Sequence, residues 1–329
     1  MYVELHAASA FSFLEAASTP EALVERAAAL GHPALAVLDR DGVYGAPRLH
    51  MAARKAGLKA LVGAELTIRT QQQPYSPHPP TLWRLPVLVG SREGYRNLCR
   101  LLTRMKAGAP KGEVTATGGA LSLEDLDGTT GGLVALAGRA VLGGARHGVG
   151  GLLDRLVGVF GRDRLYVELQ RHLQRDEEAD NHALVTLASA YHVPLIATNG
   201  VRFATADDRP LHDVLTCIRH KTDVHRAGQR LAHNAERYLK SPAQMAQLFA
   251  DRPEAVAATG ELADRLDYTM ADLGYRFPDY PVPAGETQAS FLRKVADVGA
   301  RERYRQFHDR ARAQIARELD LIEKLELAG

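Results

Sequence analysis

The sequence predicts an α/β protein built around a sheet of seven parallel strands. Short apolar runs alternate with longer amphipathic stretches through the first two hundred residues. The apolar runs lack the alternation of half-exposed strands, which is typical of strands buried on both faces. The strand-helix order repeats about seven times, and this favours parallel strands joined by right-handed crossovers. The pattern suits either a barrel closed by seven strands or an open doubly wound sheet.

Seven short segments carry the strand signal, and each is rich in Val, Ile, Leu or Ala. They are residues 2–5, 34–38, 60–68, 84–90, 132–138, 164–170 and 194–198. In both architectures the loops after the C-terminal ends of the strands carry function. The residues that follow each strand are therefore the candidates for a site.

Helices are expected between the strands. Residues 18–21 (Ser-Thr-Pro-Glu) combine a capping residue, a first-turn proline and an acid, so they begin a helix that Gly31 ends. Further amphipathic stretches run over residues 91–107 and 174–191.

The amino-acid composition changes near Phe277, where three prolines indicate an extended linker. Two charged helices are expected after it, near residues 288–307 and 308–327. The second has an apolar stripe with no partner in the chain, so we expect the sequence to be the start of a longer protein.

Composition excludes several classes of protein. Lys and Arg number 41 against 39 Asp and Glu, and this balance argues against a purely electrostatic nucleic-acid binder. The two cysteines, Cys99 and Cys217, disfavour a disulfide framework. The N-terminus lacks the pattern of a signal peptide, and no apolar run is long enough to span a membrane. We therefore expect a cytoplasmic protein with no membrane partner.

Six motifs stand at or near the predicted strands: LHAASAFSFL, ALAVLDRDG, VGAEL, EGYRNLCRL, YVELQRH and PLIATNGVRF. In this order they resemble the PHP (polymerase and histidinol phosphatase) domain at the start of bacterial C-family DNA polymerases. The details are most similar to the error-prone, damage-induced branch of the ImuC type. The tail from FPDYPVPAGET to ELDLIEKLELAG is similar to the passage into the polymerase palm.

The resemblance covers the whole chain and implies its organisation. Residues 1–220 would form an irregular, TIM-barrel-like barrel of seven strands, and residues 221–275 a helical extension of it. Residues 276–329 would be a linker and the first helices of the palm region.

The resemblance also identifies the positions that hold metal ions in active PHP domains. This chain keeps His6 and Glu65, and Glu15 can stand for a third, acidic ligand. It departs from the family's pattern at six positions, where histidine or another ligand is replaced: Ala8, Arg40, Arg84, Arg139, Gly200 and Arg202.

Four of these replacements are arginines, which offer no lone pair to a metal. Two unit charges 4 Å apart repel by roughly 4 kcal/mol at an intermediate dielectric, and a divalent ion feels about twice that. We therefore expect no metal site and no catalytic residue in this chain. The arginines would instead hold the acids Glu15, Glu65, Asp39 and Asp41 in a salt-bridge scaffold. A pocket that grips phosphate or a DNA end, and a residual metal-dependent activity, are the alternatives.

Two further features need a structural or a functional explanation. Residues 216–240 carry many basic side chains, which either form a solvated surface or contact DNA or the palm. The candidates for contact are Arg219, Lys221, Arg226 and Arg230. His172, after the sixth strand, is expected to be a hydrogen-bonded structural histidine.

These observations predict a catalytically silent PHP domain that braces an error-prone DNA polymerase used in damage-induced translesion synthesis. By resemblance, the parent protein would be a DNA-directed DNA polymerase with Mg²⁺ in a palm beyond residue 329, and this segment would need no cofactor. Expected partners are that palm and, through the parent, primer-template DNA, the sliding clamp and an ImuB-type mutasome protein. The alternatives are a metal-dependent phosphoesterase or 3′-5′ exonuclease, and an interaction module that recruits clamp or mutasome proteins.

Overall fold

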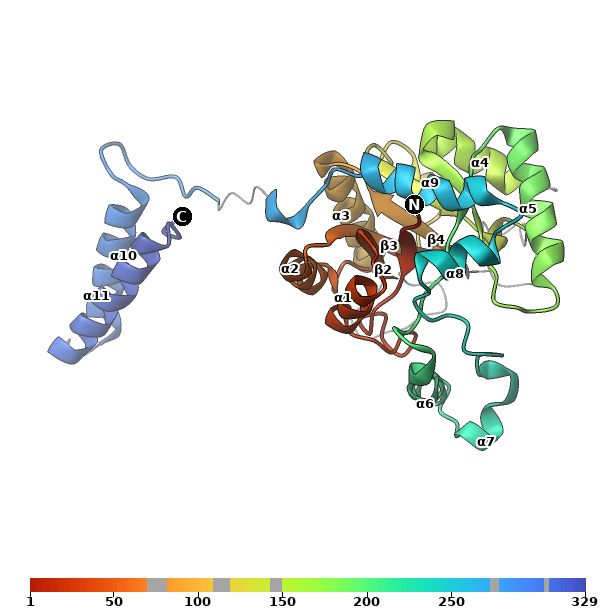
Figure 1. The fold of residues 1–329 in the computed structure, drawn as a ribbon. Coiled ribbons are helices and arrows are strands. Elements are labelled where there is room, and N and C mark those ends of the chain that lie inside the picture. The colour runs from red at the N-terminus through yellow and green to blue at the C-terminus, as the bar shows by residue number, and fades with distance from the viewer. Residues whose placement is uncertain (70–81, 109–118, 143–149, 273–277, 305–307) are drawn as a thin grey trace, which may run out of the picture. The chain divides into compact units, whose positions relative to one another are not determined.

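A computed structural model describes residues 1–69, 82–108, 119–142, 150–272, 278–304 and 308–329 (Figure 1). The chain divides into two compact units, Met1–Ala271 and Asp272–Gly329, which we describe separately as unit 1 and unit 2.

Unit 1 is built on one seven-stranded sheet whose strands lie side by side in chain order. The strands are β1 (Glu4–Ala7), β2 (Ala34–Arg40), β3 (Lys59–Arg69), β4 (Leu82–Val89), β5 (Leu133–Ala137), β6 (Leu165–Leu169) and β7 (Leu195–Ala197). Just beyond β7, Val201 forms a parallel bridge with Ala7 of β1. The curled sheet therefore meets its own first strand, which confirms the predicted irregular barrel and excludes the open sheet.

The expectation that all strands are parallel is wrong at β4. This strand runs antiparallel to both β3 and β5, whereas the other neighbouring strands pair in parallel. An antiparallel strand returns along its neighbour and needs no crossover to the far end of the sheet. The reversal matters for the site, because it places Arg84 opposite Thr67, near the C-terminal end of β3.

Helices cover the outside of the barrel, as Figure 1 shows. Thr19 caps the first of them by accepting a hydrogen bond from the backbone N–H of Ala22, and Ser91 caps the third in the same way. The covering helices are α1 (Pro20–Ala29), α2 (Ala46–Ala56), α3 (Arg92–Ala107), α4 (Gly151–Phe160) and α5 (Glu177–Tyr191). The helices expected within residues 18–31, 91–107 and 174–191 are thus present.

The segment after β7 contributes both a projecting part and a core helix. Helices α6 (Arg209–Arg219) and α7 (Val224–Ala227) extend away from the barrel, whereas α8 (Pro242–Leu248) and α9 (Pro253–Arg265) lie against it (Figure 1). Short 3₁₀ turns add to the fold at Glu124–Leu126, Arg139–Val141, Arg162–Arg164, Ala206–Asp208, Gly228–Arg230 and Met270–Asp272.

Helix α9 completes the hydrophobic core of the barrel. Its residues Leu262 and Ala258 belong to one buried cluster with strand residues such as Leu5, Leu38 and Leu136. The backbone N–H of Val3 donates to the Thr259 hydroxyl at 2.9 Å, which ties α9 to the first strand. Residues beyond 220 are therefore part of the barrel's interior as well as an extension of it.

Unit 2 is a pair of helices, α10 (Gln288–Arg303) and α11 (Asp309–Lys324). Thr287 and Ser290 form a capping box at the start of α10. Arg293 of α10 pairs with Asp320 and Glu323 of α11 at 2.6 and 2.7 Å. Within the described residues, no helix combines the length and the apolar character needed to cross a bilayer.

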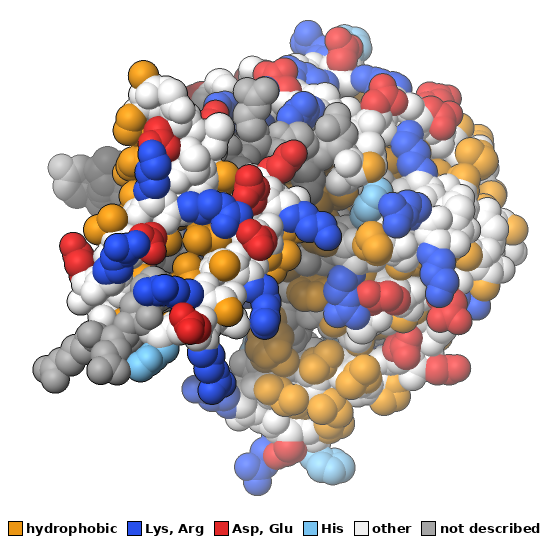
Figure 2. All heavy atoms as spheres, turned by 90° about the vertical axis from the view of Figure 1, so that its left-hand side faces the viewer, with side chains coloured by type: hydrophobic (Ala, Val, Ile, Leu, Met, Phe, Trp, Pro, Cys, Tyr) orange, Lys and Arg blue, Asp and Glu red, His pale blue; other side chains and the backbone are white. Residues whose placement is uncertain are grey.

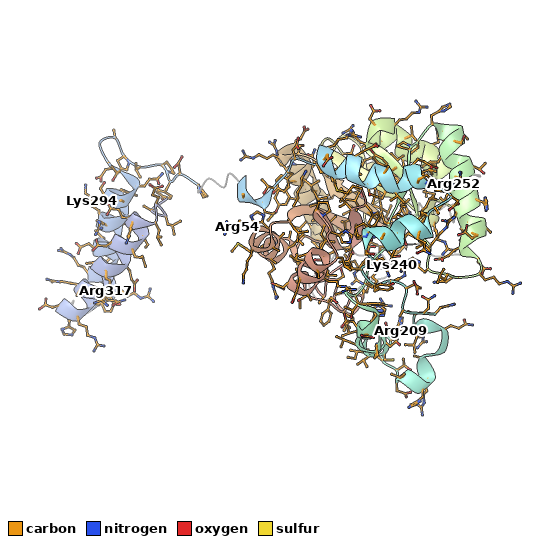
Figure 3. The ribbon with its side chains drawn as sticks, viewed as in Figure 1. Arg54, Arg209, Lys240, Arg252, Lys294 and Arg317 are labelled. Carbon is orange, nitrogen blue, oxygen red and sulfur yellow. The ribbon has the colours of Figure 1, made fainter. Side chains whose placement is uncertain are left out.

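Charge is dispersed over the face of the molecule that Figure 2 shows. Basic and acidic side chains are interspersed on the face drawn in Figure 2, in keeping with the net charge of +2. Figure 3 labels basic side chains from separate parts of unit 1, including Arg54 of α2, Arg209 of α6 and Arg252 before α9. A concentrated group of arginines is found instead at one end of the barrel.

Candidate functional site

The site is centred on a histidine held between two carboxylates. His6 lies near the end of β1 and Glu168 near the end of β6, whereas Glu65 lies in the second half of β3, opposite Arg40 at the end of β2. The Nε2 atom of His6 is 2.7 Å from Glu65 Oε1, and its Nδ1 atom is 2.6 Å from Glu168 Oε1. All three side chains are buried. Glu168 was not among the predicted site residues, although an acid inside the apolar run RLYVELQ is a signal that could have found it.

This arrangement favours the protonated imidazolium form of His6. Burial alone would lower the pKa of His6, but the charges and hydrogen bonds of Glu168 and Glu65 outweigh it and raise the pKa to about 10. Both ring nitrogens then donate protons, and neither keeps a lone pair for a metal.

Glu65 is held by a guanidinium as well as by His6. Arg202, which follows β7, donates from Nη2 to Glu65 Oε1 at 2.8 Å and from Nη1 to Oε2 at 3.3 Å. This is the bidentate geometry that makes arginine-carboxylate pairs strong. Burial would raise the pKa of Glu65, but the charge of Arg202 and the contacts with His6 and Arg202 hold it well below its usual range.

One carboxylate oxygen of Glu15 lies within ion-pair distance of three guanidinium groups. Arg40, at the end of β2, donates to Glu15 Oε1. Arg84 of β4 and Arg219 of α6 approach the same oxygen at 3.4 and 3.1 Å. Burial would raise the pKa of Glu15, but the charges of Arg84, Arg40 and Arg202 lower it. The antiparallel strand β4 and the projecting helix α6 thus meet at this residue.

The two aspartates expected in the scaffold have other main partners. Asp39 accepts hydrogen bonds from Ser9, from the Ser12 hydroxyl and from the backbone N–H of Gly45, and no arginine of the described residues lies within ion-pair distance of it. Asp41 accepts from the backbone N–H and hydroxyl of Thr67 at 2.7 and 2.8 Å.

The nearest guanidinium nitrogen to Asp41 is Nε of Arg40, at 3.9 Å. These two carboxylates were expected to bind arginine. They accept hydrogen bonds mainly from serine and threonine hydroxyls and from backbone N–H groups instead. Asp39 lies near the end of β2 and Asp41 directly after that strand, and the hydroxyl and backbone N–H donors that bind them are already within hydrogen-bond distance of both carboxylates.

Arg139 lies in a different ion-pair group. It donates from Nε to Asp180 of α5 at 2.7 Å, and its Nη1 is 3.7 Å from Glu177. Glu177 also accepts from Nδ1 of His172 at 2.8 Å, while Nε2 of His172 is 2.8 Å from the carbonyl oxygen of Asn199. His172 is thus a buried, hydrogen-bonded histidine that links loops, and Arg139 anchors helix α5.

The remaining candidate positions carry no charge into the site. Ala8 is buried, and its backbone N–H donates to the carbonyl oxygen of Val201 at 2.9 Å. Gly200 has φ +54°, and a Cβ there would lie 2.7 Å from Nε2 of Gln170, so glycine suits both the conformation and the space.

Lys221, Arg226 and Arg230, proposed with Arg219 as DNA or palm contacts, are exposed and lie outside the Glu15 and Glu65 groups. Arg226 is 3.6 Å from Asp223, three residues earlier in the chain. Arg219 is therefore the one residue of this set that the structure brings into the site.

A fifth arginine completes the site. Arg237 donates from Nη1 to the carbonyl oxygen of Gly200 at 3.4 Å, and its backbone carbonyl accepts from Arg202 at 2.9 Å. Burial and the neighbouring charge of Arg202 lower the pKa of Arg237 to about 10. We call Arg40, Arg84, Arg202, Arg219 and Arg237 the arginine cluster.

The residues present do not fit a metal centre. Among the described residues, no three or more His, Cys, Asp or Glu side chains are grouped in a way that could hold a metal ion. Both nitrogens of His6 are occupied by carboxylates, and both oxygens of Glu65 accept from Arg202. A cation entering this space would meet guanidinium groups.

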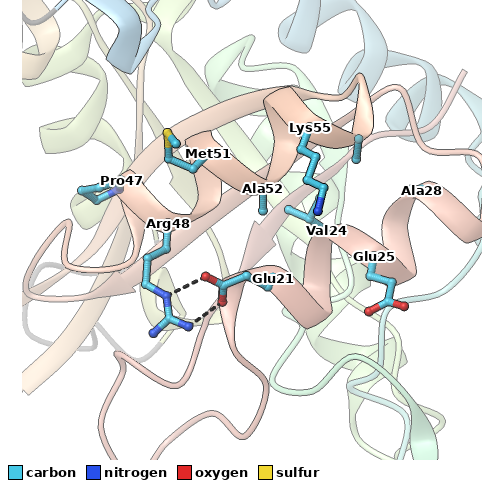
Figure 4. Close-up of a pocket in the computed structure, with 10 residues that line it drawn as sticks. Glu21, Val24, Glu25, Ala28, Pro47, Arg48, Met51, Ala52 and Lys55 are labelled. Carbon is cyan, nitrogen blue, oxygen red and sulfur yellow. Dashed lines mark hydrogen bonds and ion pairs between the residues drawn. The ribbon is translucent and has the colours of Figure 1, made fainter.

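A hollow of about 740 Å³ lies elsewhere, against helices α1 and α2 (Figure 4). Its lining includes Val24, Met51 and Ala52, and an ion pair between Arg48 and Glu21 crosses it with hydrogen bonds of 2.6 and 2.8 Å. The lining is mostly apolar and holds no group of catalytic side chains, so the arginine cluster remains the candidate site.

A match to a family of known domains defines the class of protein. Residues 4–172, just over half of the chain, match the PHP domain family, and the chain belongs to it. It is 39% identical over 339 residues to an error-prone DNA polymerase of Mycolicibacterium paratuberculosis, covering all of this chain and 30% of that protein. It is 40% identical over 288 residues to an error-prone DNA polymerase of Anaeromyxobacter dehalogenans, covering 85% of this chain and 24% of that protein.

The chain thus spans about a third or less of the length of these relatives. Among solved structures, an amidohydrolase from Chromobacterium violaceum aligns with a TM-score of 0.41 and 17% sequence identity, over 61% of this chain and 88% of that one.

Proposed function

We propose that this chain is the N-terminal part of an error-prone DNA polymerase, in which its PHP domain braces the polymerase and hydrolyses no phosphate ester. The similarity to error-prone DNA polymerases along the whole chain supports the parent activity. The observation that carries the silent role is the bidentate pair of Arg202 with Glu65, beside the His6 ion pair.

The electrostatics of the site support a structural role. Arg202 fills a position where the family places a metal ligand, and its two hydrogen bonds use both oxygens of Glu65. Removing one partner of a buried ion pair strands the other charge, which costs about 3–5 kcal/mol. The same side chains join β1, β3, β6 and the segment after β7, so their contribution is to the rigidity of the barrel end.

The finer parts of the proposal concern the whole protein. We propose that the whole protein transfers nucleotides with Mg²⁺ in its palm and acts in translesion synthesis after DNA damage, in the cytoplasm. Its proposed partners are primer-template DNA, the sliding clamp and an ImuB-type mutasome protein. The names of the relatives support the polymerase. The brace would act on that activity through stability.

Measurements of bound metal and of phosphate-ester hydrolysis test whether the PHP domain is catalytically silent. The purified chain is incubated with Mn²⁺ or Zn²⁺, dialysed, and assayed for bound metal, for phosphatase activity and for 3′-5′ exonuclease activity on single-stranded DNA. We expect less than stoichiometric metal and no turnover above that of a Glu65→Ala variant. Stoichiometric metal, with turnover that Glu65→Ala abolishes, would contradict the proposal and favour the phosphoesterase or exonuclease alternative.

A second experiment separates a brace from a recruiting module. In the full-length polymerase, Arg202→Met should lower the midpoint of thermal unfolding and the primer-extension rate together, while binding of clamp and mutasome proteins is kept. The matched control is Arg48→Met, because Arg48 forms its ion pair with Glu21 on the outer surface. Loss of partner binding at unchanged stability would instead identify a recruiting module.

A further inference from the structure

We propose that the arginine cluster binds a phosphate dianion, as orthophosphate or as a phosphate monoester, at the mouth of the barrel. This goes beyond the bracing role, since a brace requires only internal ion pairs. The inference rests on the balance of charge, on hydrogen-bond donors left over by the protein, and on access from solvent.

The cluster holds more positive charge than its acids neutralise. The cluster has five guanidinium groups, and three carboxylates, those of Glu15, Glu65 and Asp41, lie within ion-pair distance of four of them. His6 and Glu168 form a pair of their own at 2.6 Å. Arg237 donates to a backbone carbonyl, and no carboxylate of the described residues pairs with it. The cluster therefore carries an excess of two positive charges, which a dianion would neutralise.

The protein does not use all the donors of the cluster. Oε1 of Glu15 is approached by Arg40, Arg84 and Arg219, yet one carboxylate oxygen has only two lone pairs. The buried Nη1 atom of Arg84 has no hydrogen-bond partner within the described part of the chain, and Glu65 Oε2 is 3.8 Å away. A tetrahedral oxyanion offers several acceptor oxygens to such forked donors, so it would satisfy them together.

The cluster is open to solvent on one side. The side chains of Arg40, Arg84 and Arg219 are 38%, 34% and 37% exposed, whereas that of Glu65 is 3% exposed. The carboxylate thus lies beneath the guanidinium groups. An anion arriving from solvent would meet cations first, in surroundings that strengthen charge-assisted hydrogen bonds.

Calorimetric titration of the chain with sodium orthophosphate at low ionic strength tests the site. We expect saturable binding, weakened about tenfold or more by Arg219→Gln, because one charge-assisted hydrogen bond is removed. Arg219 is chosen since its side chain is partly exposed and its removal leaves the buried pairs in place. Arg48→Gln, on the outer surface, is the matched control and should bind as the unaltered chain does.

The variant Glu15→Gln supplies a test with the opposite sign. It removes a negative charge that competes for the same guanidinium groups, so phosphate binding should become tighter. Circular dichroism establishes that each variant is folded. The proposal is overturned if the unaltered chain shows no saturable binding, if Arg219→Gln and Arg48→Gln behave alike, or if folded Glu15→Gln binds phosphate more weakly.

Two oligonucleotides identify the source of the phosphate. A short single strand with a 5′-phosphate and the same strand without it are titrated in parallel. Stronger binding of the phosphorylated strand, lost in Arg219→Gln, assigns the site to a nucleic-acid end. Equal binding of both strands, together with saturable orthophosphate binding, assigns it to free phosphate. The metal and hydrolysis assays are independent of these results, so the bracing role and the phosphate site can fail separately.

Discussion

At the scale of single residues, the chemistry of the site follows from which atoms keep a lone pair. His6 and Glu65 are residue types that bind metals, yet each uses its coordinating atoms within the protein. The guanidinium of Arg202 is the deciding group, because it remains charged and can only donate. A histidine at that position would return an acceptor to the site, whereas arginine turns the same pocket into a place for anions.

The protonation of His6 gives a pH prediction. The pKa of His6 is about 10 in the folded chain and about 6.5 in an unfolded one. The ion pairs therefore contribute fully below about pH 6.5, and their contribution falls as the pH rises through the folded value, by up to about 1.4 kcal/mol per pH unit. Urea unfolding between pH 7 and 9 should show this decrease.

The NMR signals of the His6 ring supply the direct check. Both ring nitrogens should remain protonated at pH 8.5, because Glu65 and Glu168 stabilise the imidazolium. A His50→Gln variant, altered in helix α2 and outside the site, should keep the pH slope of the unaltered chain. Titration of the His6 signals near pH 6.5 would contradict the ion-pair description.

At the scale of elements, close contact between strands β3 and β4 positions the site. Gly63 of β3 lies opposite Leu88 of β4, and a Cβ at Gly63 would lie 2.2 Å from the carbonyl oxygen of Val87. Only glycine allows the two backbones to approach so closely. This pairing sets the register that brings Arg84 of β4 to the end of β3 that carries Glu65.

Substitution of Gly63 tests this contact. Gly63→Ala should destabilise the chain by about 1–3 kcal/mol, because the added methyl group overlaps the backbone of β4. The matched control is Gly158→Ala in helix α4, where a Cβ meets nothing within 4 Å, and it should stabilise by up to about 1 kcal/mol. Denaturant unfolding of both variants measures the difference, and equal effects would contradict the packing argument.

At the scale of the whole molecule, the barrel depends on a helix far along the chain. Helix α9 buries Leu262 in the cluster that lines the strands, and Leu266, the residue that follows the helix, joins the same cluster. Thr259 of α9 accepts a hydrogen bond from the backbone N–H of Val3 near the N-terminus. Fully burying a leucine contributes about 1.5–3 kcal/mol, so the loss of α9 would remove a large part of a domain's usual stability.

Two truncations test the role of α9. A chain ending after Ala271 keeps α9 and all the described core clusters of unit 1, so it should unfold cooperatively near the temperature of the whole chain. A chain ending after Arg252 lacks α9 and should lose the cooperative transition, as measured by circular dichroism on heating. Equal melting of both truncations would show that α9 is dispensable.

The seven strands and the main helices could be predicted from the amino-acid sequence, because apolar runs and capping residues are local signals. The family could be predicted as well, because six motifs in order resemble those of PHP domains. The resemblance to that family also identified most of the site, because it marked the positions of His6, Glu15, Arg40, Glu65, Arg84 and Arg202. Asp39, Asp41 and Arg139 were assigned to the arginine scaffold because they stand near the ends of predicted strands, although adjacency to a strand end does not specify a partner.

Which charges lie next to one another became clear only from the three-dimensional fold. The antiparallel course of β4 brought Arg84 to Glu15, the projecting α6 brought Arg219 there, and Glu168 of β6 closed the histidine pair. These contacts join residues far apart in sequence, and their strength depends on distance and burial. Periodicity and composition carry no information on distance or burial. A sequence pattern can therefore identify the charged residues of a site but not which of them form ion pairs.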